Sequence, residues 1–299
     1  MWLSLLAHLV STTPVPPPVT LPHEPPPREH RITILYDAFG ARRDLTRDWG
    51  FAALIEYGGK RILFDTGNNA RIFERNVRRL GVDLGRLDFA IVSHRHGDHT
   101  SGLSYLLRVN PRVTIYAPRE GFGVFGAALP ASFLHADFAL PDSMRYYGGR
   151  VPDEMRFGTP WPNARFTWVD SITQIAPGVV LISTVSSNPG TLELRELSLG
   201  VQTPEGLLLV VGCSHPGIET IIAAAERSAG HVYQIVGGMH LVTAPDSQVT
   251  RVAAALHDRW QIDLVAPGHC TGEPAFDALK RIFGTRYRYA GLGTRLPLP

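Results

Sequence analysis

The second half of the chain repeats the order of elements found in the first half. Residues 31–116 begin with strands, and a helix and further apolar strands follow. Residues 179–289 again begin with strands, which then alternate with helices. Short, wholly apolar strands such as residues 89–92 are typical of strands buried on both faces, so helices must cover the outer faces. The order therefore predicts an α/β protein in which two sheets pack face to face between helices.

The period of the apolar residues and the position of glycine define the individual elements. Strands are expected at 32–36, 51–57, 61–65, 89–92, 113–116, 179–184, 193–201, 207–211, 232–236, 263–266 and 287–289. Helices are expected at 72–80, 217–228, 246–259 and 274–283. Gly58 and Gly59 should join two of the strands as a hairpin, and Gly81 should end the first helix.

Two segments depart from this order. Residues 1–30 form a proline-rich N-terminal arm, which is either a simple tether or an arm that packs on a partner subunit of a homo-oligomer. Residues 118–166 are rich in glycine, proline and aromatic side chains, and are either an irregular insertion or a functional lid. No linker is evident elsewhere, so residues 31–299 are expected to form one domain.

Composition excludes several classes of protein. The 299 residues include 29 Lys and Arg against 27 Asp and Glu, and a net charge of +2 does not favour nucleic acid as a partner. No apolar run reaches the roughly 20 residues of a membrane span, and the N-terminus lacks a basic region and a clear cleavage site, which favours a cytoplasmic protein. Because 12 His stand against 2 Cys, any metal ligands should be mainly imidazole and carboxylate.

Four potential metal ligands lie within six residues, directly after the buried strand expected at 89–92. They are His94, His96, Asp98 and His99. His94 and His96 point to the same side of an extended chain, because side chains alternate with period two. Asp98 and His99 follow where the chain is expected to turn, so their side chains can face a second metal position nearby. Protonated imidazoles this close would repel one another without a cation, so the run predicts two neighbouring metal ions.

Three further histidines follow predicted strands and have glycine nearby. They are His215 (after 207–211), His240 (after 232–236) and His269 (after 263–266). Asp65 stands at the end of the strand at 61–65. Glycine lets the backbone approach a ligand, and functional side chains are common where strands end. We therefore expect these residues on the same rim as the first run.

With these residues in place, the chain resembles the metallo-β-lactamase superfamily. The run from His94 to His99 is similar to that superfamily's signature, Asp65-Thr66-Gly67 to its strand-end aspartate, and Pro267-Gly268-His269 to its last metal-binding histidine. The resemblance covers roughly residues 31–291. It implies a four-layer αββα sandwich, the metallo-β-lactamase fold, and a mono- or dinuclear zinc hydrolase.

Several motifs in order also resemble one subgroup, the proteins related to 7,8-dihydropterin-6-methyl-4-(β-D-ribofuranosyl)-aminobenzene-5′-phosphate synthase. They include Gly212-Cys213-Ser214-His215, the run from Gly237 to Leu241, and His269-Cys270-Thr271-Gly272. Members of such a group need not share a substrate. The subgroup usually has a bulky aromatic residue where Gly97 stands, a change that could widen the pocket.

The chain departs from the wider family at two positions, and this changes the expected ligands. Residues 186–190 lack the histidine of the family's Pro-Gly-His-Thr loop. The family's bridging aspartate is also missing, since Cys213 occupies that neighbourhood. We infer that His215 supplies the missing imidazole. The two expected ligand sets are His94, His96 and His215, and Asp98, His99 and His269. Cys213 could bind a metal, lie beside it or simply pack, whereas Asp65 would support the ligands.

The resemblance implies that a zinc-bound hydroxide attacks a small-molecule ester, with a phosphoester slightly favoured over a carboxylic ester, lactone or lactam. Two Zn²⁺ ions fit the ligand set, and Mn²⁺ or Fe²⁺ are alternatives. Asp98 would orient the nucleophile. His240 would donate a proton or hydrogen bond to the leaving group, bind a metal, or support the ligands through a hydrogen bond. Two other functions are a synthase reaction like that of the subgroup, and a non-catalytic metal-binding role.

Overall fold

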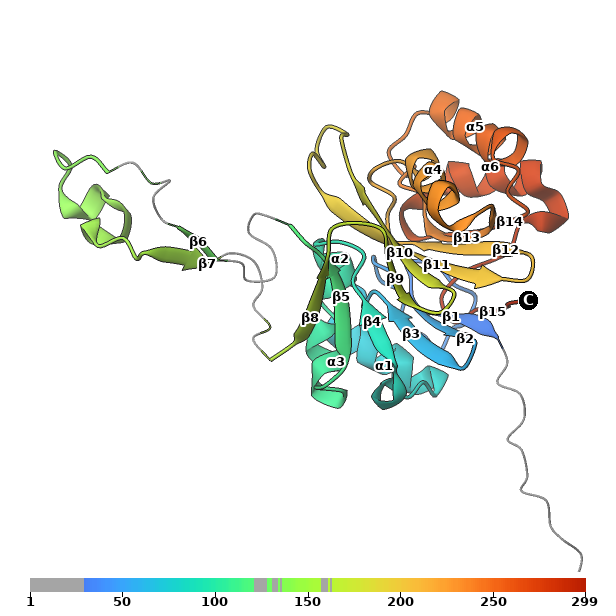
Figure 1. Cartoon of the computed structure of the whole chain (residues 1–299), viewed down its shortest axis with the longest axis horizontal. Coiled ribbons are helices and arrows are strands. Elements are labelled where there is room, and N and C mark those ends of the chain that lie inside the picture. The colour runs from blue at the N-terminus through green and yellow to red at the C-terminus, as the bar shows by residue number, and fades with distance from the viewer. Residues whose placement is uncertain (1–29, 121–127, 131–133, 135, 157–160, 162) are drawn as a thin grey trace, which may run out of the picture.

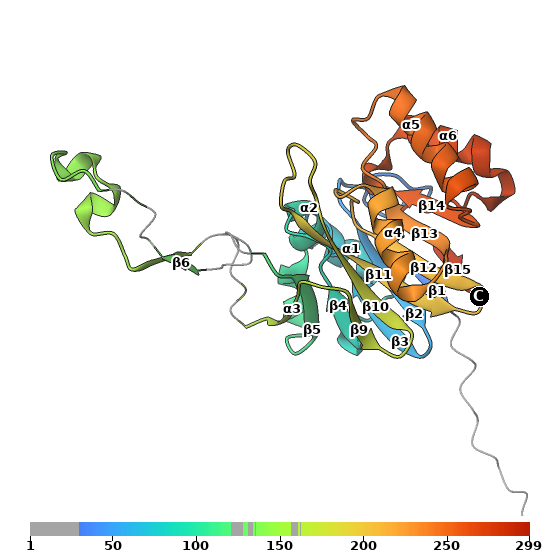
Figure 2. The ribbon, with the colours of Figure 1, turned by 45° about the horizontal axis from the view of Figure 1, so that its top comes forward.

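The protein is a sandwich of two β-sheets with helices on both outer sides (Figures 1 and 2). The computed structural model describes residues 30–299 apart from 121–127, 131–133, 135, 157–160 and 162. The proline-rich arm therefore lies outside the described residues, except for His30. The four-layer αββα arrangement predicted from the sequence is confirmed.

The first sheet has the strand order β15-β1-β2-β3-β4-β5-β8. Its strands are β1 (Arg31–Tyr36), β2 (Ala52–Tyr57), β3 (Lys60–Phe64), β4 (Phe89–Ile91), β5 (Thr114–Pro118), β8 (Arg165–Val169) and β15 (Arg295–Pro297). The expected hairpin joins β2 and β3, where Tyr57 pairs with Lys60. Gly58 and Gly59 both have positive φ, 54° and 76°, the backbone conformation that a two-residue hairpin loop requires.

The second sheet has the strand order β14-β13-β12-β11-β10-β9. Its strands are β9 (Thr173–Ala176), β10 (Val179–Val185), β11 (Arg195–Thr203), β12 (Gly206–Val211), β13 (Val232–Gly238) and β14 (Leu264–Gly268). Strands β12, β13 and β14 are parallel, as are β3, β4, β5 and β8 in the first sheet. The carboxyl ends of parallel strands lie at one edge of a sheet, where α/β proteins usually bind ligands.

Three apolar clusters correspond to the three interfaces between the layers. One fills the space between the sheets, with side chains such as Ile34 and Phe64 against Leu199 and Val210. The outer faces of the two sheets are covered by helices. They are α1 (Ala70–Leu80), α2 (Gly97–Thr100) and α3 (Leu103–Val109) on the side of the first sheet, and α4 (Ile218–Ala229), α5 (Asp246–Ala254) and α6 (Glu273–Phe283) on the side of the second.

Most expected elements are present, and the differences lie at the edges. The prediction of a strand at 287–289 is wrong. Only an isolated bridge joins Tyr287 to Val265, and the strand that follows is β15. Helix α5 ends at Ala254 and continues as a π-helical turn, Ala255–Arg259. Strands β8, β9 and β15 were not expected, because each is short and partly exposed and lacks a strong apolar period.

The segment at 118–166 contains a two-stranded ribbon, β6 (Ala128–Pro130) paired with β7 (Glu154–Arg156), and two 3₁₀ turns in its described part. In both views of the molecule, the described part of this segment lies away from the sandwich (Figures 1 and 2). The choice between insertion and lid stays open. Among the described residues, no helix is long and apolar enough to cross a membrane.

Candidate metal centre

The residues expected to bind metal meet where the parallel strands of both sheets end. His94 follows β4, and His96 precedes the short helix α2, which contains Asp98 and His99. From the second sheet, His215 follows β12, and His269 follows β14. The run from His94 to His99 and the two distant histidines, His215 and His269, thus converge at one edge of the sandwich.

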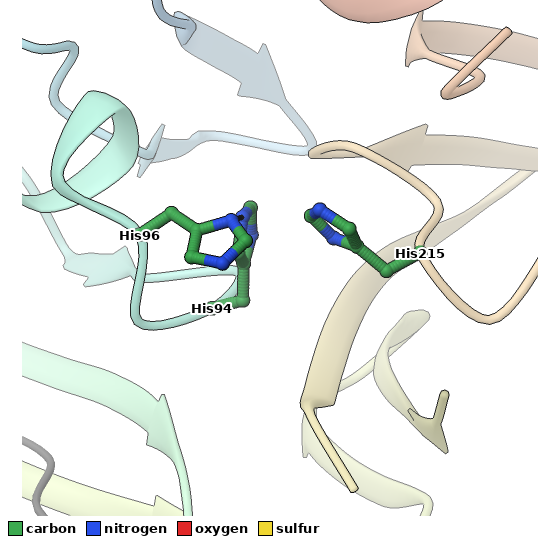
Figure 3. A group of neighbouring side chains, drawn as sticks. All are labelled: His94, His96 and His215. Atoms are coloured by element: carbon green, nitrogen blue, oxygen red, sulfur yellow. Dashed lines mark hydrogen bonds between the residues drawn. The ribbon is translucent and has the colours of Figure 1, made fainter. Parts of the chain in front are cut away.

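The first set of ligands is His94, His96 and His215, whose ligand atoms lie within 4.8 Å of one another. Figure 3 shows the first two rings projecting from one loop and His215 facing them from the loop of the other sheet. His94 and His215 are buried, with 0% and 2% exposure. The Nε2 atom of His94 is 3.1 Å from the Nδ1 atom of His96.

The second set is Asp98, His99 and His269, which meets the same distance criterion. The Oδ2 atom of Asp98 is 3.3 Å from the Nε2 atom of His269 and 3.7 Å from that of His99. The two sets share no residue, and the rings of His94 and His99 connect them at a centroid distance of 4.1 Å. The structure therefore assembles the two sets that the sequence predicts.

The nitrogen and oxygen atoms of the two sets are better satisfied by divalent cations than by hydrogen bonds to one another. Both ring nitrogens of His269 are buried and have no hydrogen-bond partner among the described residues. Burial and neighbouring histidines hold the pKa of His94 well below its usual value and lower that of His96 to about 4. Neutral imidazoles present lone pairs, and nitrogens facing each other at 3.1 Å need a proton or a cation between them. The set of nitrogen and carboxylate donors is the one that zinc commonly uses.

Asp65 orients the ligands of the first sheet. Its Oδ2 atom accepts from the Nδ1 atom of His99 at 2.7 Å and from Ser93 Oγ at 2.7 Å, and its Oδ1 atom accepts from the Ser93 amide. Ser93 Oγ in turn accepts from the Nδ1 atom of His94 at 2.8 Å. Both imidazoles therefore turn their Nε2 atoms towards the site. Carboxylate–histidine pairs of this kind fix the tautomer of a metal ligand.

Burial alone would lower the pKa of His99, but Asp65 and Asp98 raise it to about 9. Without a metal ion, both nitrogens of the His99 ring would thus be protonated at neutral pH, and the ring would be positively charged. A cation bound at Nε2 would replace that positive charge, and the Nδ1 proton would remain on the side of Asp65.

Glu196 supports the loop of the second sheet, and the sequence analysis missed it. This carboxylate is fully buried in β11. Its oxygens accept the amides of Cys213, Ser214 and His215 at 2.8–2.9 Å, and the Nδ1 atom of His215 at 3.1 Å. Burial would raise the pKa of Glu196, but the bonds from His215 and the amides outweigh it and lower the pKa. The available signal was weak, because Glu196 lies in a strand that also contains Arg195, Ser198, Gln202 and Thr203.

Asp37, just after β1, plays a similar part for the third loop and was also missed. Its Oδ2 atom accepts the amide of His269 at 2.9 Å, and its Oδ1 atom accepts the amide of Ala38. Burial raises the pKa of Asp37 to about 8. No motif near Asp37 indicates this role, because the bond joins residues more than 200 positions apart in the sequence.

Cys213 and His240 lie beside the two sets. The buried Sγ atom of Cys213 is 3.2 Å from the Nε2 atom of His99, close enough to reach a metal there. His240 belongs to neither set, and its exposed ring lies 4.4 Å from that of His215. It instead forms a group with Cys213 and Cys270, and Cys213 also forms a group with His94 and His99.

A cavity of about 500 Å³ opens next to His215 and His240. Most of its wall comes from the loops after β12 and β13 and from helices α4 and α5, and polar side chains such as Thr220, Gln248 and Arg251 line it. Arg251 forms an ion pair with Glu219 in the same wall. A space of this size accommodates a small molecule.

Comparison with known proteins agrees with this geometry. The chain is 28% identical over 263 residues to 7,8-dihydropterin-6-methyl-4-(beta-D-ribofuranosyl)-aminobenzene-5'-phosphate synthase of Methanocaldococcus jannaschii, covering 80% of this chain and 86% of the relative. It is 32% identical over 121 residues to ribonuclease TTHA0252 of Thermus thermophilus, covering 40% of this chain and 24% of that one. The crystal structure of Tm1679, a metal-dependent hydrolase of the beta-lactamase superfamily, superposes with a TM-score of 0.68 at 25% identity, covering 90% of this chain and 99% of that one. The family model of the metallo-beta-lactamase superfamily matches residues 46–199, and the chain therefore belongs to this superfamily.

Proposed function

We propose that this protein is a metal-dependent hydrolase of small-molecule phosphoesters. The observation that carries the proposal is the pair of three-residue ligand sets, side by side at one edge of the sandwich and next to a polar cavity. Three-residue sets leave coordination positions open, as catalytic sites require, whereas a structural zinc site has four protein ligands. The partial match to a ribonuclease supports a phosphoester, since RNA is a phosphodiester.

The two sets would hold two Zn²⁺ ions, and Mn²⁺ or Fe²⁺ are the alternatives. When bound, such ions lower the pKa of a coordinated water and polarise the phosphoryl oxygen. Asp65 and Glu196 keep the imidazoles in the tautomer that such ions require.

Asp98 would orient the attacking water. Its side chain is 19% exposed, whereas those of His99 and His269 are buried. Burial would raise the pKa of Asp98, but the two histidines outweigh it and lower the pKa. Asp98 is therefore ionised at neutral pH and can accept a hydrogen bond from water.

His240 would donate a proton to the leaving group. It lines the cavity next to His215 and is exposed. A hydrogen bond with Cys270 raises the pKa of His240 above its usual value and outweighs burial, which lowers it. A larger protonated fraction at neutral pH suits a proton donor.

A second candidate is a synthase reaction of the kind named for the Methanocaldococcus jannaschii relative. The match to that relative extends over 80% of this chain, more than the match to the ribonuclease. A carbon–carbon bond-forming reaction would use the same ligand sets and cavity. A substrate panel separates the two candidates.

The test combines metal analysis of the purified full chain with turnover of p-nitrophenyl phosphodiester, phosphotriester, carboxylic ester, lactone and β-lactam substrates. We expect at least about two metal ions per chain and the highest turnover with the phosphodiester. His96→Ala and His269→Ala should each lose metal and turnover, whereas His257→Ala, remote from both sets, should lose neither. Full metal content and turnover in both site variants would refute the scheme. Turnover of no ester by the metal-loaded protein would favour the synthase.

A further inference from the structure

We propose that Cys213, His240 and Cys270 form a third metal-ligand set, which binds a thiophilic cation such as Zn²⁺ or Cu⁺ beside the two histidine-containing sets. One ligand atom from each of these residues lies within 4.8 Å of the others. The set shares no residue with either of the other two. A third cation could therefore bind without removing a ligand from either histidine-containing set, but it would occupy the imidazole of His240, which could then not donate a proton to a leaving group.

Three adjacent parallel strands each contribute one of the three ligands. Cys213 follows β12, His240 follows β13, and Cys270 follows β14. Zinc binds sulfur at about 2.3 Å and imidazole nitrogen at about 2.0–2.1 Å, so tetrahedral ligand atoms lie well within 4.8 Å of one another. The spacing of the strand ends thus already suits a metal ion.

Simple packing does not account well for the two thiols. A free cysteine usually behaves as a small apolar side chain among apolar neighbours. Here the Sγ atom of Cys213 faces an imidazole nitrogen of His99 at 3.2 Å, and that of Cys270 lies 3.5 Å from the carbonyl oxygen of Cys213. Both sulfur atoms therefore have polar neighbours, although both side chains are buried.

The backbone around the set is arranged to bring the ligands together. A Cβ atom on Gly238 would lie 2.5 Å from the carbonyl oxygen of Gly212 and 2.7 Å from the Sγ atom of Cys270, so glycine lets β13 pass both the loop after β12 and this thiol. The backbone of His240 has a φ of 50°, a left-handed conformation that costs a non-glycine residue about 1 kcal/mol or more. This conformation places the imidazole at the rim of the cavity, next to the buried thiols. A cation can therefore enter from the cavity and meet two soft donors and one imidazole.

The chain contains only two cysteines, and this makes the test specific. The full-length protein is titrated with Cd²⁺ while near-ultraviolet absorbance reports thiolate-to-metal charge transfer, and bound metal is counted by mass spectrometry. We expect a charge-transfer band from two thiolates, which falls to about half in Cys213→Ser and in Cys270→Ser and disappears in the double variant.

His240 is tested by its conservative replacement. Asparagine tolerates the left-handed conformation, so His240→Asn removes the imidazole with little backbone cost. We expect at least about tenfold weaker Cd²⁺ binding to the thiolate set in this variant. The matched control is His257→Asn. His257 lies on the π-helical turn, outside the three ligand sets, so this variant should leave the titration unchanged.

Two results would overturn the proposal. A band that needs Cys213 but not Cys270 would mean that Cys213 alone joins the metal near His99. Absence of a band in the folded wild-type protein would mean that the thiols only pack. If the serine variants fail to fold, X-ray absorption of the wild-type protein loaded with a single equivalent of Cd²⁺ decides: two sulfur neighbours per Cd²⁺ support the third set, and one or none overturns it.

Discussion

Glu196→Gln tests whether a buried carboxylate holds the loop that carries His215. In the structure, one carboxylate oxygen accepts the amides of Cys213 and Ser214, and the other accepts the amide and the Nδ1 atom of His215. Glutamine has nearly the same shape but offers one acceptor oxygen and one NH₂ group. Whichever way the amide is turned, two donors lose their acceptor and face another donor.

The expected cost follows from those two lost contacts. Hydrogen bonds to a charged group contribute about 1.5–3 kcal/mol each, so Glu196→Gln should lower the free energy of unfolding by roughly 3–6 kcal/mol. The His215 ring also loses the partner that fixes its tautomer, so metal affinity at the first set should fall about 10- to 100-fold. Urea unfolding and chelator competition measure the two effects.

Glu120→Gln is the matched control, because its carboxylate is also buried but is bonded differently. One oxygen accepts from Arg195 and Arg95, while the other has no hydrogen-bond partner among the described residues. Glutamine can keep its oxygen at the first position and place its NH₂ group at the second. We expect a smaller loss of stability and no change in metal affinity. If Glu196→Gln matches the wild type in both measurements, the assignment of Glu196 is wrong.

The same substitution should change the pH dependence of stability. The pKa of Glu196 is lowered in the folded state, so its contribution is fully present above the pKa of the unfolded chain, about 4.3. That contribution is lost as the pH falls through the folded pKa. The stability difference between wild type and Glu196→Gln should therefore shrink below about pH 4, and a constant difference down to low pH would contradict this reasoning.

Three further outcomes follow from the site and its supports. Asp65→Asn tolerates the left-handed backbone at this position but removes the charge beside His99, so metal affinity should fall about 10- to 100-fold in chelator competition. Gly102→Ala places a Cβ atom 2.1 Å from the Thr66 carbonyl oxygen, so the free energy of unfolding in urea should fall by about 1–3 kcal/mol. Gly97→Ala is the control, because the nearest atom to its Cβ lies 3.6 Å away, and its free energy of unfolding should change little. Removing metal with a chelator should lower the melting temperature, because an ion that binds only the folded state stabilises it; an unchanged value would argue against bound metal.

The sequence predicts the parts of this protein that local patterns determine. Apolar strands and amphipathic helices give the layers, and strand ends with histidine give both ligand sets. Asp65 was expected as a support from its position at a strand end, but the other two supporting acids could not be predicted in this way. Glu196 and Asp37 act on loops that are distant in the sequence, and their partners are backbone amides, which no side-chain motif records. The edge strand β15 was missed because its pairing with β1 joins the two ends of the domain.

The buried carboxylates also explain how the strand ends keep an unfavourable backbone. Among the described residues, seven non-glycine residues have positive φ, and Asp65, Ser214, His240 and His269 lie at the metal-binding edge. Such conformations cost about 1 kcal/mol or more each and persist only where the surroundings fix them. The amide of Ser214 is held by Glu196, that of His269 by Asp37, and Asp65 is fixed through its bonds to Ser93. Asp65 and Glu196 thus fix the tautomers of His99 and His215. Together with Asp37, they also hold the turns from which the ligand side chains project into the site.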